Sequence, residues 1–85
     1  MAHVVLEIWS TVADSERAAY MDRARERQAA LQGLGVSYWI FERSDAPGEM
    51  VQYLEARDSA RLEEARALVS QLPGEREILL HQLEL

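Results

Sequence analysis

The sequence contains no cysteine and no lysine, and it has only two prolines and four glycines. Without cysteine, neither a disulfide nor a thiolate metal site can stabilise the chain, and without lysine Schiff-base chemistry is excluded. No apolar run approaches the ~20 residues of a membrane span, and residues 1–13 lack the basic start of a secretory signal. We therefore expect a cytoplasmic protein with no membrane partner.

Positive charge is also scarce, because nine arginines stand against fifteen acidic residues and leave a net charge of −6. Nucleic-acid binding needs concentrated positive charge, so this class of partner is disfavoured. The all-arginine set has two interpretations, anion recognition and the codon bias of a GC-rich genome, and we favour the second. Residues 1–85 are short enough to form one domain, which would gain stability by forming oligomers.

Segments rich in β-branched and aromatic residues alternate with segments of helical periodicity. They predict strands over residues 3–10, 36–43, 49–56 and 77–84, and helices over residues 15–32 and from Asp58 or Ser59 to Pro73. A turn over residues 44–48 joins the middle two strands. This βαββαβ order predicts an α+β, ferredoxin-like fold: a four-stranded antiparallel sheet, ordered fourth, first, third, second, with both helices on one face.

Each predicted helix carries one apolar stripe. The first helix has Thr11 and Asp14 as candidate N-caps. The stripe of the first helix consists of Tyr20, Ala24 and Leu31, and that of the second helix of Leu62, Ala65, Val69 and Leu72. Arg27 falls within the first stripe, either extending its head group to solvent or pointing into a cleft, and we expect the former.

Alternation along the strands divides the sheet into a helix face and an open face. Val4, Leu6 and Ile8 are all aliphatic and belong to the helix face. The open face then carries Glu7 and most of the aromatic residues, namely Trp9, Trp39, Phe41 and Tyr53. Large exposed apolar patches mark interaction sites, so we expect a homodimer that packs through the open face.

The fourth strand does not divide so clearly. Its odd-numbered residues are the more apolar set, which favours the helix face for them. However, a histidine is easier to place on an open or cavity-lining face than in a covered core. We therefore place His81 on the open face.

The order of elements, the length and the stretch from Met50 to Ser59 resemble the dimeric α+β barrel superfamily, in particular its antibiotic-biosynthesis-monooxygenase branch. This resemblance implies two sheets closed into a barrel, with a small-molecule cavity in each protomer. Members include cofactor-independent oxygenases of aromatic substrates, haem-degrading enzymes and domains without known activity. The oxygenases use a Trp, an Asn and a Tyr; Trp39 and Tyr53 match two of these, but the sequence has no asparagine. The haem-degrading members use a helical histidine, whereas both histidines here lie on predicted strands.

The open face also suggests a site. His81, oriented by Glu7, would act as a general acid or base, and Tyr53 would donate a phenolic hydrogen bond. The substrate would lie against three aromatic walls, Trp39, Trp9 and Phe41. The alternatives are an ordinary His–Glu contact and aromatic dimer packing. We expect no metal, although His3, His81 and Glu7 could supply ligands, and no cofactor.

Three functions remain open at this point. The first is an oxygenase or related small enzyme acting on a hydrophobic aromatic substrate, the second a non-catalytic small-molecule-binding module, and the third a dimerisation domain. An open barrel would favour the first two, since a filled one leaves nothing to bind.

Overall fold

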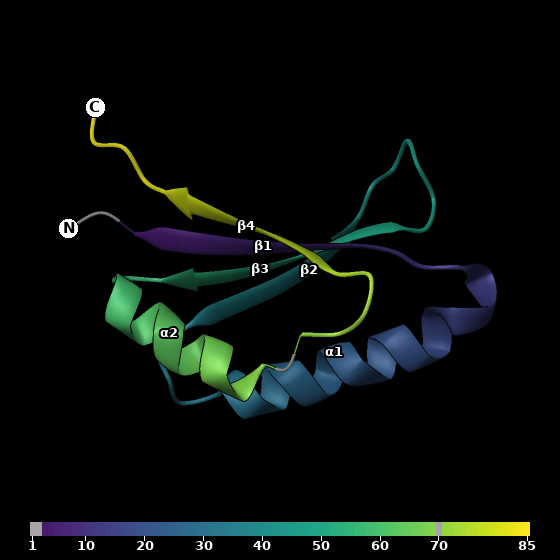
Figure 1. The fold of residues 1–85 in the computed structure, drawn as a ribbon, viewed down its shortest axis with the longest axis horizontal. Coiled ribbons are helices and arrows are strands. Elements are labelled where there is room, and N and C mark those ends of the chain that lie inside the picture. Colours follow the sequence, from purple (N-terminus) through teal and green to yellow (C-terminus); the bar gives the residue numbers. More distant parts are fainter. Residues whose placement is uncertain (1–2, 70) are drawn as a thin grey trace.

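The computed structural model describes residues 3–69 and 71–85, which form a four-stranded sheet with two helices on one side (Figure 1). The strands are β1 (Val4–Thr11), β2 (Ser37–Glu42), β3 (Glu49–Ala56) and β4 (Arg76–His81), and the helices are α1 (Arg17–Leu31) and α2 (Ser59–Leu68). The strands run in the order β2-β3-β1-β4 and every neighbouring pair is antiparallel. The predicted ferredoxin-like α+β fold and its sheet order are therefore confirmed.

The core lies between the sheet and the helices. Val4, Leu6 and Ile8 of β1 are buried there, as the alternation predicted. They pack with Leu54 of β3, which is fully buried, and with the apolar residues Leu31, Ala56, Leu62 and Ala65. Burying each large aliphatic side chain contributes roughly 1.5–3 kcal/mol, so this layer fixes the helices on one face.

Both helices begin later or end earlier than predicted. A 3-10 turn (Asp14–Glu16) precedes α1, and neither Thr11 nor Asp14 caps the helix. Asp58 does cap α2, because its carboxylate accepts a 2.8 Å hydrogen bond from the Arg61 backbone N–H. However, α2 ends at Leu68, so Val69 and Leu72 of the predicted stripe lie after the helix; Val69 still packs against the core, and Leu72 is half-buried.

The turn between β2 and β3 packs back against the end of β1. The carbonyl of Gly48 accepts a 2.8 Å hydrogen bond from the N–H of Val12. Gly48 has a φ of +90°, and a Cβ at this position would lie 2.8 Å from the Val12 carbonyl oxygen. Only glycine combines this backbone angle with such a close approach, and it makes the predicted turn.

Strand β4 is an edge strand that neither helix covers. It is shorter than predicted, ending at His81 rather than at residue 84. Leu79 has the same orientation as Leu6, its partner in β1, yet half of its surface is exposed.

Within the described residues, no helix is long and apolar enough to cross a membrane.

Candidate functional site

The open face brings together five of the six residues predicted to form a site. In the pairing register, Tyr53 stands opposite Glu7 on one side and Trp39 on the other. Trp9 donates a 3.1 Å hydrogen bond from its indole Nε1 to Glu7 Oε1. Phe41 packs edge-to-face against Tyr53, with ring centroids 5.7 Å apart. Burial, helped by the neighbouring Glu7 carboxylate, raises the pKa of Tyr53, so its hydroxyl remains a hydrogen-bond donor at neutral pH.

His81 is not part of this group, and its predicted placement on the open face is wrong. It pairs with Val4 in β1, and directly paired residues point to the same side of a sheet, so His81 has the orientation of the helix face. Instead Ile78 and Leu80 of β4 share the open face with Glu7 and Val5. The prediction failed because it assumed that the helix face of β4 is a covered core, whereas His81 is exposed there. Glu7 therefore orients no histidine.

The second histidine, His3, contacts Glu55 near the end of β1. The distance from Nδ1 to Oε1 is 3.6 Å, and both side chains are partly exposed to solvent. Among the residues that the structure describes, no three His, Asp or Glu side chains are grouped closely enough to hold a metal ion.

A different site lies on the helix face, around Arg27. Its side chain is only 8% exposed, so the expectation that its head group reaches solvent is wrong. Arg27 makes a two-pronged ion pair with Glu75, with N–O distances of 2.7 and 2.8 Å, and also donates a 3.1 Å hydrogen bond to Gln52 Oε1. Glu75 is 4% exposed, and its carboxylate accepts a further 2.8 Å bond from the Leu72 N–H. The connection between α2 and β4 is thereby tied to α1.

Gln52 connects the ion pair to two tyrosines. Its amide nitrogen donates to the Tyr20 hydroxyl at 2.9 Å, while the Tyr38 hydroxyl donates to its carbonyl oxygen. Tyr20, Arg27, Tyr38, Gln52 and Glu75 together are called the buried polar cluster below. Strand alternation places Gln52 on the helix face between Met50 and Leu54, so this polar residue in an apolar series was the sequence signal for the cluster.

Burial and pairing set the charge states in the cluster. Burial alone raises the pKa of Glu75, but the hydrogen bonds from Arg27 and the Leu72 N–H outweigh it and lower the pKa overall. Burial raises the pKa of Tyr38 strongly and that of Tyr20 as well. At neutral pH the cluster therefore consists of one ion pair and neutral hydroxyl and amide groups.

The lowered pKa of Glu75 predicts a loss of stability in acid. A carboxylate whose pKa is lower in the folded state stabilises the fold above its unfolded pKa, and this contribution disappears as the pH falls through the folded value. The Glu75→Gln variant should be less stable than the parent at pH 7, and the difference should shrink as the pH falls below about 4.5. Urea unfolding of both proteins from pH 7 to pH 3 measures this difference in stability. A difference that does not change with pH would contradict a lowered pKa for Glu75.

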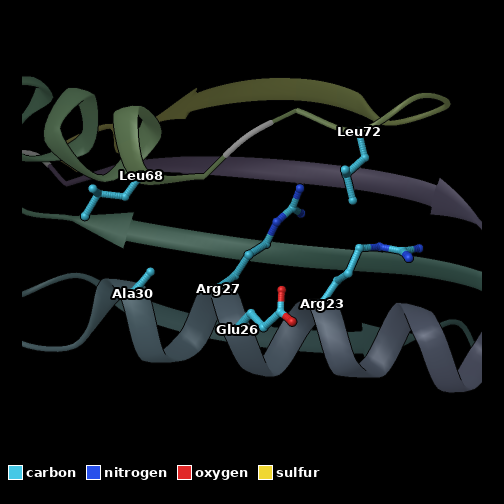
Figure 2. Close-up of a pocket in the computed structure, with 6 residues that line it drawn as sticks. All are labelled: Arg23, Glu26, Arg27, Ala30, Leu68 and Leu72. Atoms are coloured by element: carbon cyan, nitrogen blue, oxygen red, sulfur yellow. The ribbon is translucent and has the colours of Figure 1, made fainter.

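A pocket of about 270 Å³ borders the cluster, between α1 and the segment that follows α2. This outer pocket is shown in Figure 2 and is lined by Arg23, Glu26, Arg27, Ala30, Leu68 and Leu72. In this view Arg27 extends from α1 across the space towards the sheet and the connecting segment, between Ala30 and Arg23. The outer pocket thus combines three apolar residues with three charged ones, and of the charged residues only Arg27 is buried in the wall. A mostly apolar hollow with a few fixed polar groups is the usual form of a small-molecule site, and this pocket has the fixed polar group.

Solved structures with this fold come from several organisms. Rv0793 from Mycobacterium tuberculosis superimposes with a TM-score of 0.74 at 19% identity, covering 96% of both chains. A provisionally named antibiotic biosynthesis monooxygenase from Deinococcus radiodurans gives a TM-score of 0.76 at 15% identity, covering 96% of this chain and 94% of its own. A variant of SnoaB, a cofactor-independent oxygenase from Streptomyces nogalater, superimposes with a TM-score of 0.67 at 10% identity. The match covers 98% of this chain and 92% of the SnoaB chain.

Identities this low show a common fold, so the resemblance to the antibiotic-biosynthesis-monooxygenase branch is confirmed for the fold. A scan of protein-family models and a search of curated proteins gave no match.

Proposed function

We propose that this protein is a cofactor-independent oxygenase that binds a small hydrophobic aromatic substrate in the outer pocket. The observation that carries the proposal is the buried guanidinium of Arg27 in the pocket wall, held in place by Glu75 and Gln52. A volume of about 270 Å³ is at the small end for ligand pockets, which favours a substrate of one or two rings.

The chemistry follows from the charge of Arg27. Oxygenation without a cofactor requires an electron-rich substrate, and a phenol becomes electron-rich when it loses its proton. Arg23 and Arg27 outweigh Glu26 in the pocket lining, so the lining is net positive and favours a phenolate, and the guanidinium of Arg27, fixed by its pairing with Glu75, costs no reorganisation. Glu75 keeps that geometry, while its lowered pKa makes it a poor base. The proton therefore leaves to solvent.

The aromatic residues that match the oxygenase pattern do not take part in this site. Trp39 and Tyr53 lie on the open face, on the opposite side of the sheet from Arg27. Tyr20 and Tyr38 do not line the outer pocket either; we infer that they support the site by holding Gln52 beside Arg27.

Oxygen uptake with naphthalene-1,5-diol tests the proposal. One oxygen atom of O₂ becomes a new ring carbonyl, and the other leaves as water with two hydrogens of the diol, giving a hydroxynaphthoquinone. The protein should consume one O₂ per diol, with no added metal or flavin. The Arg27→Gln/Glu75→Gln double variant keeps a neutral hydrogen-bonding pair and should lose about hundredfold in kcat/KM.

The matched control is Arg25→Gln, also on α1, because Arg25 is exposed and, among the described residues, forms an ion pair with Asp22 alone. Its activity should equal that of the parent. Uptake no faster than the uncatalysed reaction, or equal rates in the double variant and the parent, would rule out the proposed activity.

The open face supports a second proposal, that two copies associate through it. Trp39 and Phe41 are 46% and 53% exposed, and Ile78 and Leu80 extend the apolar surface across β4. A surface of this kind is costly to leave in water and is buried when two sheets pack face to face. If the protein has no catalytic activity, association through the open face would support the third candidate function, a dimerisation domain.

A further inference from the structure

Arg23 lines the outer pocket with a guanidinium that no acidic side chain holds. Within residues 3–69 and 71–85, no hydrogen bond or ion pair joins it to another group. Apart from Arg57, every other arginine forms an ion pair: Arg17, Arg25, Arg27, Arg43, Arg61, Arg66 and Arg76. The chain has fifteen acidic residues for nine arginines, so an unpaired arginine in a pocket wall is unusual here.

Arg23 lies one helical turn before Arg27 on α1. Residues four apart share one side of a helix and are separated by about 6 Å along its axis, so both side chains border the same space. Two like charges at this spacing destabilise a helix. The charge of Arg27 is matched by Glu75, whereas that of Arg23 is matched by no group in direct contact.

Three acidic residues lie near Arg23 without pairing with it. Glu26 also lines the outer pocket, and Figure 2 shows the guanidinium of Arg23 extending away from it. Glu16 and Glu75 line a smaller hollow together with Arg23. Both carboxylate oxygens of Glu75, however, are held by Arg27. The N–H groups of Arg23 are therefore available to a ligand in the outer pocket.

The chemistry of this group selects a flat anion with a single charge. The N–H groups of a guanidinium form a planar fork that matches the two oxygens of a carboxylate. A doubly charged phosphate would be repelled more strongly by Glu16 and Glu26 than a carboxylate would. Because Arg23 is exposed, a carboxylate bound to it keeps part of its water, so the cost of desolvation is small.

The spacing of the two arginines suits one aromatic skeleton. When a phenol oxygen and a carboxylate stand at opposite ends of a ring system, they are separated by about the same distance as Arg23 and Arg27 along α1. The volume of the outer pocket, about 270 Å³, has space for one or two rings between them.

We propose that Arg23 binds a carboxylate of the aromatic ligand, so that the outer pocket takes hydroxylated aromatic carboxylates. This inference rests on the proposed function, since it requires the outer pocket to hold the ring with its phenol oxygen at Arg27. Arg23 then determines specificity and takes no part in the oxygenation step.

Calorimetry without oxygen at pH 7 separates this specificity from catalysis. It should compare 5-hydroxynaphthalene-1-carboxylate with naphthalene-1,5-diol, which has the same skeleton and a hydroxyl in place of the carboxylate. The parent should bind the carboxylate about tenfold more tightly at low ionic strength, the gain expected for charge-assisted hydrogen bonds. The preference should shrink as salt is added, because Arg23 is exposed and its charge is screened.

The Arg23→Gln variant removes the charge from the pocket wall. It should bind the two ligands equally, with its affinity for the diol the same as in the parent. The matched control is Arg25→Gln, which removes the same charge from α1 at a residue outside the pocket lining. It should keep the tenfold preference.

The outcomes separate this inference from the proposed function. Equal binding of the two ligands by the parent would overturn the role of Arg23, and so would a preference that survives in Arg23→Gln or disappears in Arg25→Gln. Binding of the carboxylate that depends on Arg23, without oxygen uptake by either ligand, would support the specificity and rule out the oxygenase alone. Binding of neither ligand would overturn both.

Discussion

Replacing Arg27 with methionine is expected to lower the free energy of unfolding by about 3–5 kcal/mol, as measured by urea denaturation at pH 7. The substitution keeps the packing volume of the stem but leaves the Glu75 carboxylate, only 4% exposed, without its cation. It also removes a donor from Gln52, which then holds only the two tyrosines. An uncompensated buried charge is among the most destabilising single changes in a small domain.

Two further variants distinguish a buried ion pair from general damage. Arg27→Met/Glu75→Gln should recover more than half of the lost stability, because the remaining amide is neutral and can still accept from the Leu72 N–H. Arg25→Met removes an exposed ion pair on the same helix and should cost no more than about 0.5 kcal/mol. Equal losses in Arg27→Met and Arg25→Met would contradict the buried position of Arg27.

Replacing Trp39 with glutamate is expected to weaken self-association at least about hundredfold, since central aromatic residues dominate interface energies. The new carboxylate would lie near Glu7 and Glu55 on the open face of each copy and would lose its water on association. Because nearly half of the Trp39 side chain is exposed in the single chain, the variant should still fold. Sedimentation velocity over micromolar concentrations measures the change, with circular dichroism as the check on folding.

The control for this experiment is Leu68→Glu, which places the same charge on an exposed apolar position of α2, on the other side of the sheet. It should associate like the parent. A parent protein that sediments as a monomer at these concentrations would show that the open face does not pair with a second copy.

The sequence predicted the parts of this fold that follow from local patterns. Alternation in β1, β2 and β3 was enough to identify both faces of the sheet. The helices bury every second side chain of β1, β2 alternates between exposed and half-buried residues over most of its length, and in β3 the open-face residue Val51 is buried together with the helix-face residues. It failed for β4, where no helix covers either side and hydrophobicity carries no directional information. His81 was misplaced for this reason.

The buried polar cluster was harder to predict, because its members are far apart in the sequence. Arg27 and Glu75 are ordinary surface residue types, and only the return of the chain after α2 places them 2.7 Å apart. The position of Arg27 within an apolar stripe was visible, but a long side chain in such a stripe is compatible with either direction. Gln52 carried the clearer signal, since strand alternation directs its short amide into the core with no alternative path to solvent.

The pairing of β1 with β4 has a consequence for the order of folding during synthesis. Partners in this pair are separated by 67 residues at Trp9 and Arg76 and by 77 at Val4 and His81. A ribosome adding about 5–20 residues per second needs roughly 3–15 seconds to span that interval. For that time one edge of β1, a strand rich in valine, leucine and isoleucine, has no partner. One edge of β1 therefore stays open to aggregation until β4 emerges, even after β3 has paired with the other edge, and chaperones that shield extended apolar segments should bind the nascent chain during that interval.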